Sequence, residues 1–98
     1  MLADGVAMKN GSTVLVEVEL TAKRESRYQS ILTSHARRLA SGQANLIRYV
    51  CTIDAARVVA RMADQVVFRD QRGGFEIVAK FDEQGRWVAG SANGDTLP

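Results

Sequence analysis

Apolar and polar residues alternate between residues 16 and 21, which is the period of a half-buried β-strand. Successive side chains of a strand point to opposite faces, so Glu17, Glu19 and Thr21 share one face, which Lys23 continues if the strand extends that far. The opposite face is apolar and consists of Val14, Val16, Val18 and Leu20. Neighbouring carboxylates repel each other, and a fold offsets that cost with a cation, a hydrogen-bond network or exposure to water. We expect both glutamates to be partly shielded from water, and this strand to be the best place to look for function.

The rest of the chain alternates between strand and helix patterns. Residues 4–8 predict a strand that an Asn10–Gly11 turn joins to the glutamate strand. One helix opens over residues 23–27, carries Tyr28 and His35 in its apolar stripe and ends at Gly42, and a second helix is capped by Asp54. The other predicted elements are strands over residues 46–52, 75–81 and 86–89, an optional strand over 66–68, and a loop over 71–74.

This order, ββαβα(β)ββ, predicts an α/β fold in which a small mixed sheet packs against two helices and ends in a C-terminal β-hairpin. Strands that alternate with helices imply at least one right-handed parallel crossover. A chain of 98 residues suffices for one domain, which we place at residues 1–90, followed by a frayed tail over 91–98.

Charge is unevenly distributed along the chain. The formal net charge is only +2, yet residues 20–61 hold eight basic and two acidic residues. Arginine outnumbers lysine and matches the geometry of phosphate, which favours binding to a phosphate backbone. The alternative is a merely solvated basic helix face.

Composition excludes several classes of protein. A basic region followed by an apolar stretch is absent from the N-terminus, and apolar runs are too short to span a membrane, so we expect a cytoplasmic protein. The single cysteine, Cys51, is expected to be a buried core residue in a reducing compartment. One cysteine and one histidine cannot supply a four-ligand zinc site.

Asp4 and Glu17 stand on the two strands of the opening hairpin, which can bring their carboxylates together. Carboxylate oxygens are ligands for Mg²⁺. Such an ion polarises a phosphate and activates an attacking water, while a nearby lysine stabilises the developing charge. The pattern therefore indicates phosphodiester hydrolysis.

The chain resembles the PD-(D/E)XK nuclease-like superfamily, in which an Asp strand is followed by an acidic-x-Lys strand. Over residues 2–66 it resembles more closely the replication-relaxation family of plasmids and integrative elements, through the string Glu-x-Glu-x-Thr-x-Lys over 17–23, the helix with Tyr28 and the strand from Leu46. Two positions depart from the pattern: Ala3 precedes Asp4 where Pro is usual, and Glu19 occupies the lysine position. Lys23 can take the lysine role from the strand end; alternatively, Glu19 is the acid and Thr21 occupies the lysine position, which breaks the motif.

The resemblance implies a restriction-endonuclease-like core with a metal-dependent site. Its implied catalytic residues are Asp4, Glu17, Glu19 and Lys23. Mg²⁺ or Mn²⁺ would be held by Asp4, Glu17 and Glu19. DNA would be held by Arg24, Arg27, Arg57 and Arg61.

Two functions stay open at this point. The first is a DNA-binding or DNA-processing domain of a mobile-element protein, which if active is a Mg²⁺-dependent endonuclease. The second is a catalytically degenerate scaffold that mediates assembly, with the terminal hairpin closing the sheet edge against a second copy. Because the chain starts almost at the Asp strand, we expect a homodimer or a further partner domain to complete it. Trp87 is expected to be a core or interface anchor.

Overall fold

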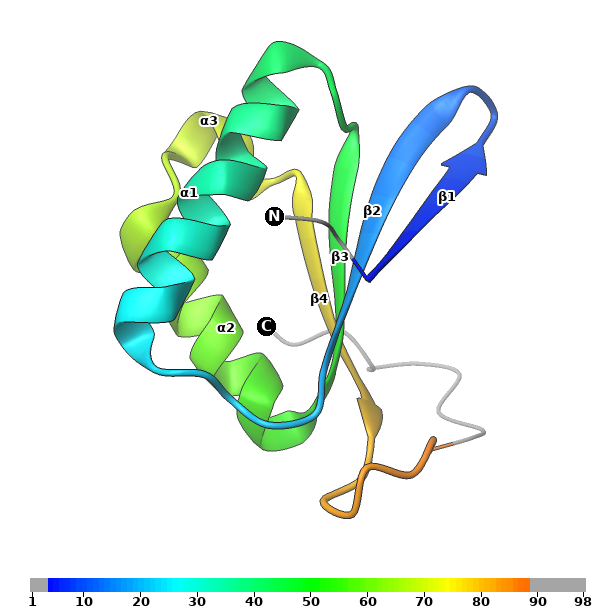
Figure 1. Cartoon of the computed structure of the whole chain (residues 1–98), viewed down its shortest axis with the longest axis vertical. Coiled ribbons are helices and arrows are strands. Elements are labelled where there is room, and N and C mark those ends of the chain that lie inside the picture. Colours follow the sequence, from blue (N-terminus) through cyan, green and yellow to red (C-terminus); the bar gives the residue numbers. More distant parts are fainter. Residues whose placement is uncertain (1–3, 89–98) are drawn as a thin grey trace.

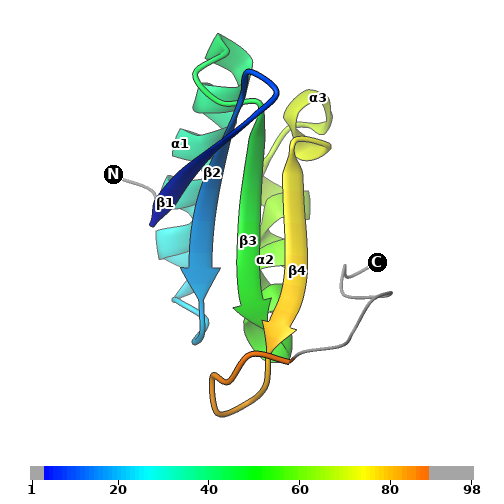
Figure 2. The ribbon, with the colours of Figure 1, turned by 90° about the vertical axis from the view of Figure 1, so that its right-hand side faces the viewer.

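Four strands and three helices form a two-layer α/β structure in a computed structural model that describes residues 4–88. The elements are β1 (Gly5–Lys9), β2 (Ser12–Glu19), α1 (Glu25–Ser41), β3 (Leu46–Thr52), α2 (Ile53–Val66), α3 (Arg69–Arg72) and β4 (Phe75–Phe81). The strands lie side by side in the order β1-β2-β3-β4. The β1–β2 pair is antiparallel and the other two pairs are parallel, which confirms the expected small mixed sheet. Helices α1 and α2 cover one face of the sheet, and Figure 2 looks onto the other (Figures 1 and 2).

The opening hairpin is set by its turn. Asn10 and Gly11 both have positive φ, 53° and 80°, as the two central residues of a type I′ turn require. The turn fixes the register that pairs Gly5 with Val16. Asp4 lies one residue before β1, so the strand begins later than predicted, but the register still brings Asp4 beside Glu17.

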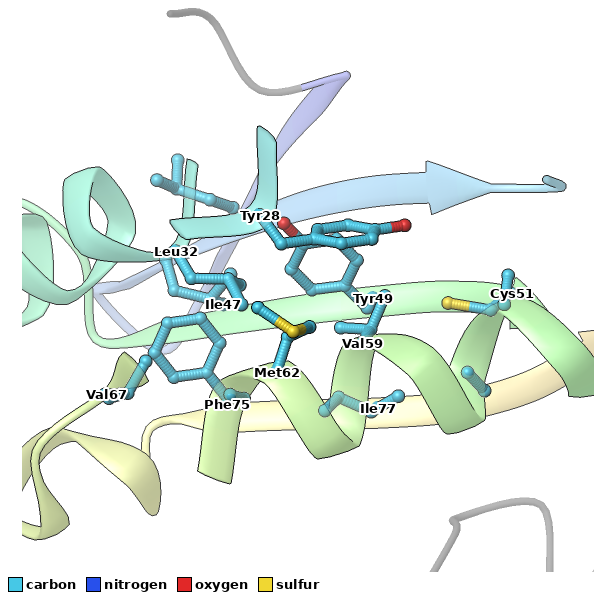
Figure 3. Packing of buried hydrophobic residues seen from close by; sticks show 14 of the residues in the cluster. Tyr28, Leu32, Ile47, Tyr49, Cys51, Val59, Met62, Val67, Phe75 and Ile77 are labelled. Carbon is cyan, nitrogen blue, oxygen red and sulfur yellow. The ribbon is translucent and has the colours of Figure 1, made fainter. Parts of the chain in front are cut away.

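The alternation of side chains along β2 decides which of them face the helices. Leu15, Glu17 and Glu19 face α1, while Val16 and Val18 lie on the face that no described helix covers. The core between sheet and helices is formed by Tyr28, Leu32, Ile47, Tyr49, Cys51, Val59, Met62, Phe75 and Ile77, among others (Figure 3). Cys51 is buried and has no disulfide partner, as expected. The two glutamates therefore lie at the border of this core.

Helices α2 and α3 correct three local predictions. The cap of α2 is Thr52, whose Oγ1 accepts a hydrogen bond from the amide of Ala55 at 3.3 Å, and Asp54 lies in the first turn instead. Residues 66–68 form no strand, because the helix continues to Val66 and the amide of Val67 donates to the carbonyl of Ala63. The apolar side chain of Val67 then packs into the core. Part of the predicted loop over 71–74 belongs to α3.

As far as residue 88, the predicted terminal hairpin consists of a turn and a single bridge. Asp82 accepts hydrogen bonds from the amides of Gln84 and Arg86, and in this described part the returning chain pairs with β4 between Phe81 and Trp87. Trp87 is exposed rather than part of the core. The tail predicted over 91–98 lies outside the described residues. Between residues 4 and 88 no helix has the length and apolar character that crossing a membrane requires.

Candidate functional site

One pocket gathers the acidic strand residues and two basic residues. It has a volume of about 190 Å³ and lies where β2 ends, α1 begins and β1 starts. Its walls are formed by Asp4, Glu17, Val18, Glu19, Lys23, Arg27, Ile31 and Tyr49. All four catalytic residues implied by the resemblance thus line a single pocket.

Asp4 and Glu17 are held side by side by two hydrogen bonds. The amide of Asp4 donates to Oε1 of Glu17 at 2.8 Å, and Oδ2 of Asp4 accepts from the amide of Val18 at 2.7 Å. Both bonds follow from the hairpin register, which aligns the residue before β1 with the end of β2. The two carboxylates are therefore fixed relative to each other by backbone groups.

Behind Glu17 lies a relay of two side chains from α1. Nε2 of His35 lies 3.1 Å from Oε2 of Glu17, and a guanidinium nitrogen of Arg38 lies 3.2 Å from Nδ1 of His35. Arginine can only donate, so Nδ1 must accept and Nε2 must carry the proton that His35 donates to Glu17. His35 is fully buried, which fixes the ring.

The same relay keeps Glu17 ionised. Burial by itself would raise the pKa of Glu17, but the hydrogen bonds from His35 and from the amide of Asp4, together with electrostatic attraction to His35 and Lys23, lower the pKa below its ordinary value. An ionised carboxylate is the form that binds a cation.

Glu19 has a hydrogen-bond donor on each of its two oxygens. One of its oxygens pairs with the ammonium of Lys23 at 2.5 Å, and the other accepts from the hydroxyl of Tyr28 at 3.0 Å. The Tyr28 oxygen in turn accepts a hydrogen bond from the amide of Lys23 at 3.0 Å. Tyr28 of α1 thus connects the end of β2 with the segment that leads into the helix. The side chain of Glu19 is almost completely buried, and this network compensates its charge.

Tyr49 differs from Tyr28 in one respect. Its side chain is buried and lines the pocket, yet its hydroxyl has no hydrogen-bond partner among residues 4–88. Burial, together with the charges of Glu17 and Glu19, raises the pKa of Tyr49, so its hydroxyl stays protonated.

The four arginines predicted to hold DNA are placed differently. Arg27 lines the pocket, and Arg24 is exposed at the N-cap of α1. Arg57 lies 3.9 Å from Asp54 and Arg61 lies 3.0 Å from Glu25, both in exposed ion pairs. Of these four arginines, Arg27 is thus the one that lines the pocket.

Sequence reasoning missed the supporting residues. It placed Tyr28 and His35 as packing residues on the sheet, placed Arg38 at the end of the first helix with phosphate contact as the alternative, and assigned Tyr49 no part in the site. The useful signal was a tyrosine and a histidine seven residues apart in one helix stripe, directly after a strand with two acids on one face. Polar residues in a buried stripe need partners.

The pocket offers two carboxylates as ligands for Mg²⁺, which is fewer than the three that the resemblance implied. Over residues 4–88, His, Cys, Asp and Glu side chains form no group of three or more that could hold a metal ion. However, Mg²⁺ commonly binds through one or two carboxylates and completes its shell with water and substrate phosphate. Asp4 and Glu17 supply such a pair, and each carboxylate oxygen that accepts one hydrogen bond keeps a second lone pair. Glu19 is already paired with Lys23.

Comparisons with protein-family models, with curated proteins and with solved structures return no match.

Proposed function

We propose that this domain binds DNA and hydrolyses phosphodiester bonds with a divalent metal ion. The observation that supports the proposal is the single pocket that holds three carboxylates, a lysine and an arginine. These residues come from the start of β1, the end of β2 and the entry to α1, and a merely solvated acidic strand would not need to bring them together. The mobile-element context implied by the resemblance stays a prediction.

Asp4 and Glu17 would hold Mg²⁺ or Mn²⁺, and His35 would keep the Glu17 carboxylate oriented and ionised. When bound, such an ion polarises a phosphate and lowers the pKa of a coordinated water. Glu19 holds Lys23 at the pocket wall. An ammonium group has three donors, so Lys23 can contact a phosphate while keeping this ion pair.

Arg27 would hold the phosphate backbone from the first turn of α1. It lines the pocket and is exposed, and the N-terminal end of a helix favours anions. Arg24 at the N-cap would extend this contact, and Arg57 and Arg61 would add to it only after loosening their ion pairs. Binding that rests on such contacts falls steeply with salt.

A cleavage assay with labelled DNA tests the proposal. We expect cutting that requires Mg²⁺ or Mn²⁺ and is abolished by Asp4→Asn and by Glu17→Gln. Glu76→Gln is the matched control, because Glu76 is a half-buried strand carboxylate paired with Arg48 and does not line the pocket. Arg27→Ala should weaken DNA binding more than Arg57→Ala. A protein that binds DNA in a salt-dependent way but never cuts it would refute the catalytic part, and one that does neither would refute the whole proposal.

A second candidate, assembly with another copy of the chain, is favoured by the side of the sheet that no described helix covers. Val18 is exposed there, Leu20 just after β2 is exposed as well, and β4 is an edge strand whose only described partner beyond β3 is the bridge at Trp87. Exposed apolar residues beside an open edge favour pairing with a second sheet. Light scattering during size-exclusion chromatography should give a dimer mass, which Val18→Lys lowers to a monomer mass. A monomer in the unsubstituted protein would refute this candidate.

A further inference from the structure

The Tyr49 hydroxyl is a buried hydrogen-bond donor that finds no acceptor in the described part of the chain. Tyr49 lies on β3, is 1% exposed, and its ring packs edge-on against the His35 ring at 6.1 Å between centroids. Its hydroxyl has no hydrogen-bond partner within residues 4–88, although Tyr49 lines the pocket. Figure 3 shows the rings of Tyr28 and Tyr49 close together with their hydroxyls pointing in different directions.

The nearby carboxylate oxygens each already accept a hydrogen bond from another donor, and none is within hydrogen-bonding geometry of the Tyr49 hydroxyl. The oxygens of Glu17 accept from Asp4 and His35, and those of Glu19 accept from Lys23 and Tyr28. A buried polar group without a partner costs free energy, and most such groups in folded proteins have a partner. The hydroxyl oxygen lies just beneath the surface of the pocket, so an acceptor from outside would satisfy it once a neighbouring pocket side chain moves aside.

We infer that the Tyr49 hydroxyl donates a hydrogen bond to a phosphate oxygen of the bound substrate and forms, with Lys23 and Arg27, the phosphate subsite of the pocket. This inference rests on the proposed function. Three donors that line one pocket suit an anion with several acceptor oxygens, and α1 begins beside them with its positive end.

The carboxylates add a condition to phosphate binding. Asp4 and Glu17 line the same pocket and would repel an anion that entered alone. Phosphate should therefore bind together with a divalent cation that compensates these charges. The subsite predicts that Mg²⁺ strengthens phosphate binding, and that loss of the Tyr49 hydroxyl weakens phosphate binding without changing the affinity for Mg²⁺ alone.

Calorimetry on the full chain tests the inference with Mg²⁺ alone and with inorganic phosphate in the presence and absence of Mg²⁺. For Tyr49→Phe we expect phosphate in the presence of Mg²⁺ to bind about 10- to 100-fold more weakly, which corresponds to one lost hydrogen bond to a charged group. Mg²⁺ affinity should not change, and the thermal midpoint should equal or exceed that of the unsubstituted protein. Thr13→Val is the matched control, because it removes a hydroxyl from the same sheet outside the pocket and should leave phosphate binding unchanged.

Each outcome has a distinct meaning. Equal phosphate affinity in Tyr49→Phe and the unsubstituted protein overturns the inference and leaves the proposed function standing. A lower thermal midpoint in Tyr49→Phe shows that the hydroxyl has a structural partner, which also overturns the inference. If the unsubstituted protein binds no Mg²⁺, both the proposed function and the inferred phosphate subsite are refuted.

Discussion

Tyr28 and Tyr49 allow the same substitution to be tested in two opposite environments. Both side chains are almost completely buried beside the two glutamates. The Tyr28 hydroxyl donates to Glu19 at 3.0 Å and accepts from the amide of Lys23 at 3.0 Å, whereas the Tyr49 hydroxyl has no partner in the described part of the chain. Tyr→Phe removes one oxygen atom in each case and leaves the ring in place. We expect Tyr28→Phe to destabilise the protein and Tyr49→Phe to stabilise it.

The magnitudes follow from the bonds that are lost. A hydrogen bond to a charged group contributes about 1.5–3 kcal/mol, and Tyr28→Phe also leaves the amide of Lys23 without its acceptor. The free energy of unfolding should therefore fall by about 2–3 kcal/mol. For a domain of this size, about 2 kcal/mol lowers the thermal midpoint by roughly 8–16 °C. Tyr49→Phe removes an unsatisfied hydroxyl, so the free energy of unfolding should rise by about 1 kcal/mol.

Urea unfolding followed by circular dichroism measures both changes, and the slope of free energy against urea should stay the same in all three proteins. A shared slope shows that the substitutions changed stability rather than the compactness of either state. Equal losses of stability in the two variants would refute the reasoning, because they would mean that the Tyr49 hydroxyl is satisfied as fully as that of Tyr28.

Three further predictions concern titration, tautomer and thiol reactivity. The lowered pKa of Glu17 means that its contribution to stability is fully present above its ordinary pKa of 4.5 and is lost as pH falls through the lower folded value. Urea unfolding above and below pH 4.5 should show this loss, Glu17→Gln should flatten it, and an unchanged profile in the variant would contradict the assignment. Long-range proton–nitrogen NMR correlations should find the proton of His35 on Nε2, and Arg38→Met should weaken that preference; a proton on Nδ1 would break the relay. Burial raises the pKa of the Cys51 thiol to about 12, so a thiol reagent should label it only after unfolding, and rapid labelling of the folded protein would show that β3 opens readily.

The features that the sequence predicted are those with local causes. The period-two pattern of β2 and the Asn10–Gly11 turn each specify backbone geometry within a few residues. Together they fix the register of the hairpin, and the register alone places Asp4 beside Glu17. The glutamates are partly shielded, as expected, but α1 shields them and not the apolar row on the opposite face of the strand.

No local pattern in the sequence predicted that the helices would cover the face of β2 that carries Glu17 and Glu19. The row with Val16 and Val18 is the more apolar side of β2, yet α1 and α2 lie on the side of Glu17 and Glu19. The path of the chain decides this, because a crossover between the parallel strands β2 and β3 is right-handed and places α1 on one particular face. The inner stripe of α1 then has to satisfy the acids that it covers.

The polar residues of β2 and α1 therefore depend on each other. Without His35 and Tyr28, the two glutamates would be shielded charges with too few donors, and without the glutamates the two α1 side chains would be buried donors with no acceptor. The pairing also follows the direction of the elements: the later acid, Glu19, meets the earlier helix residue, Tyr28, as expected when a helix returns antiparallel to the strand before it. Neither half of this pattern is informative alone. A strand with alternating acids followed by a helix stripe that contains a tyrosine and a histidine indicates a buried polar network, and here that network ends in an open pocket.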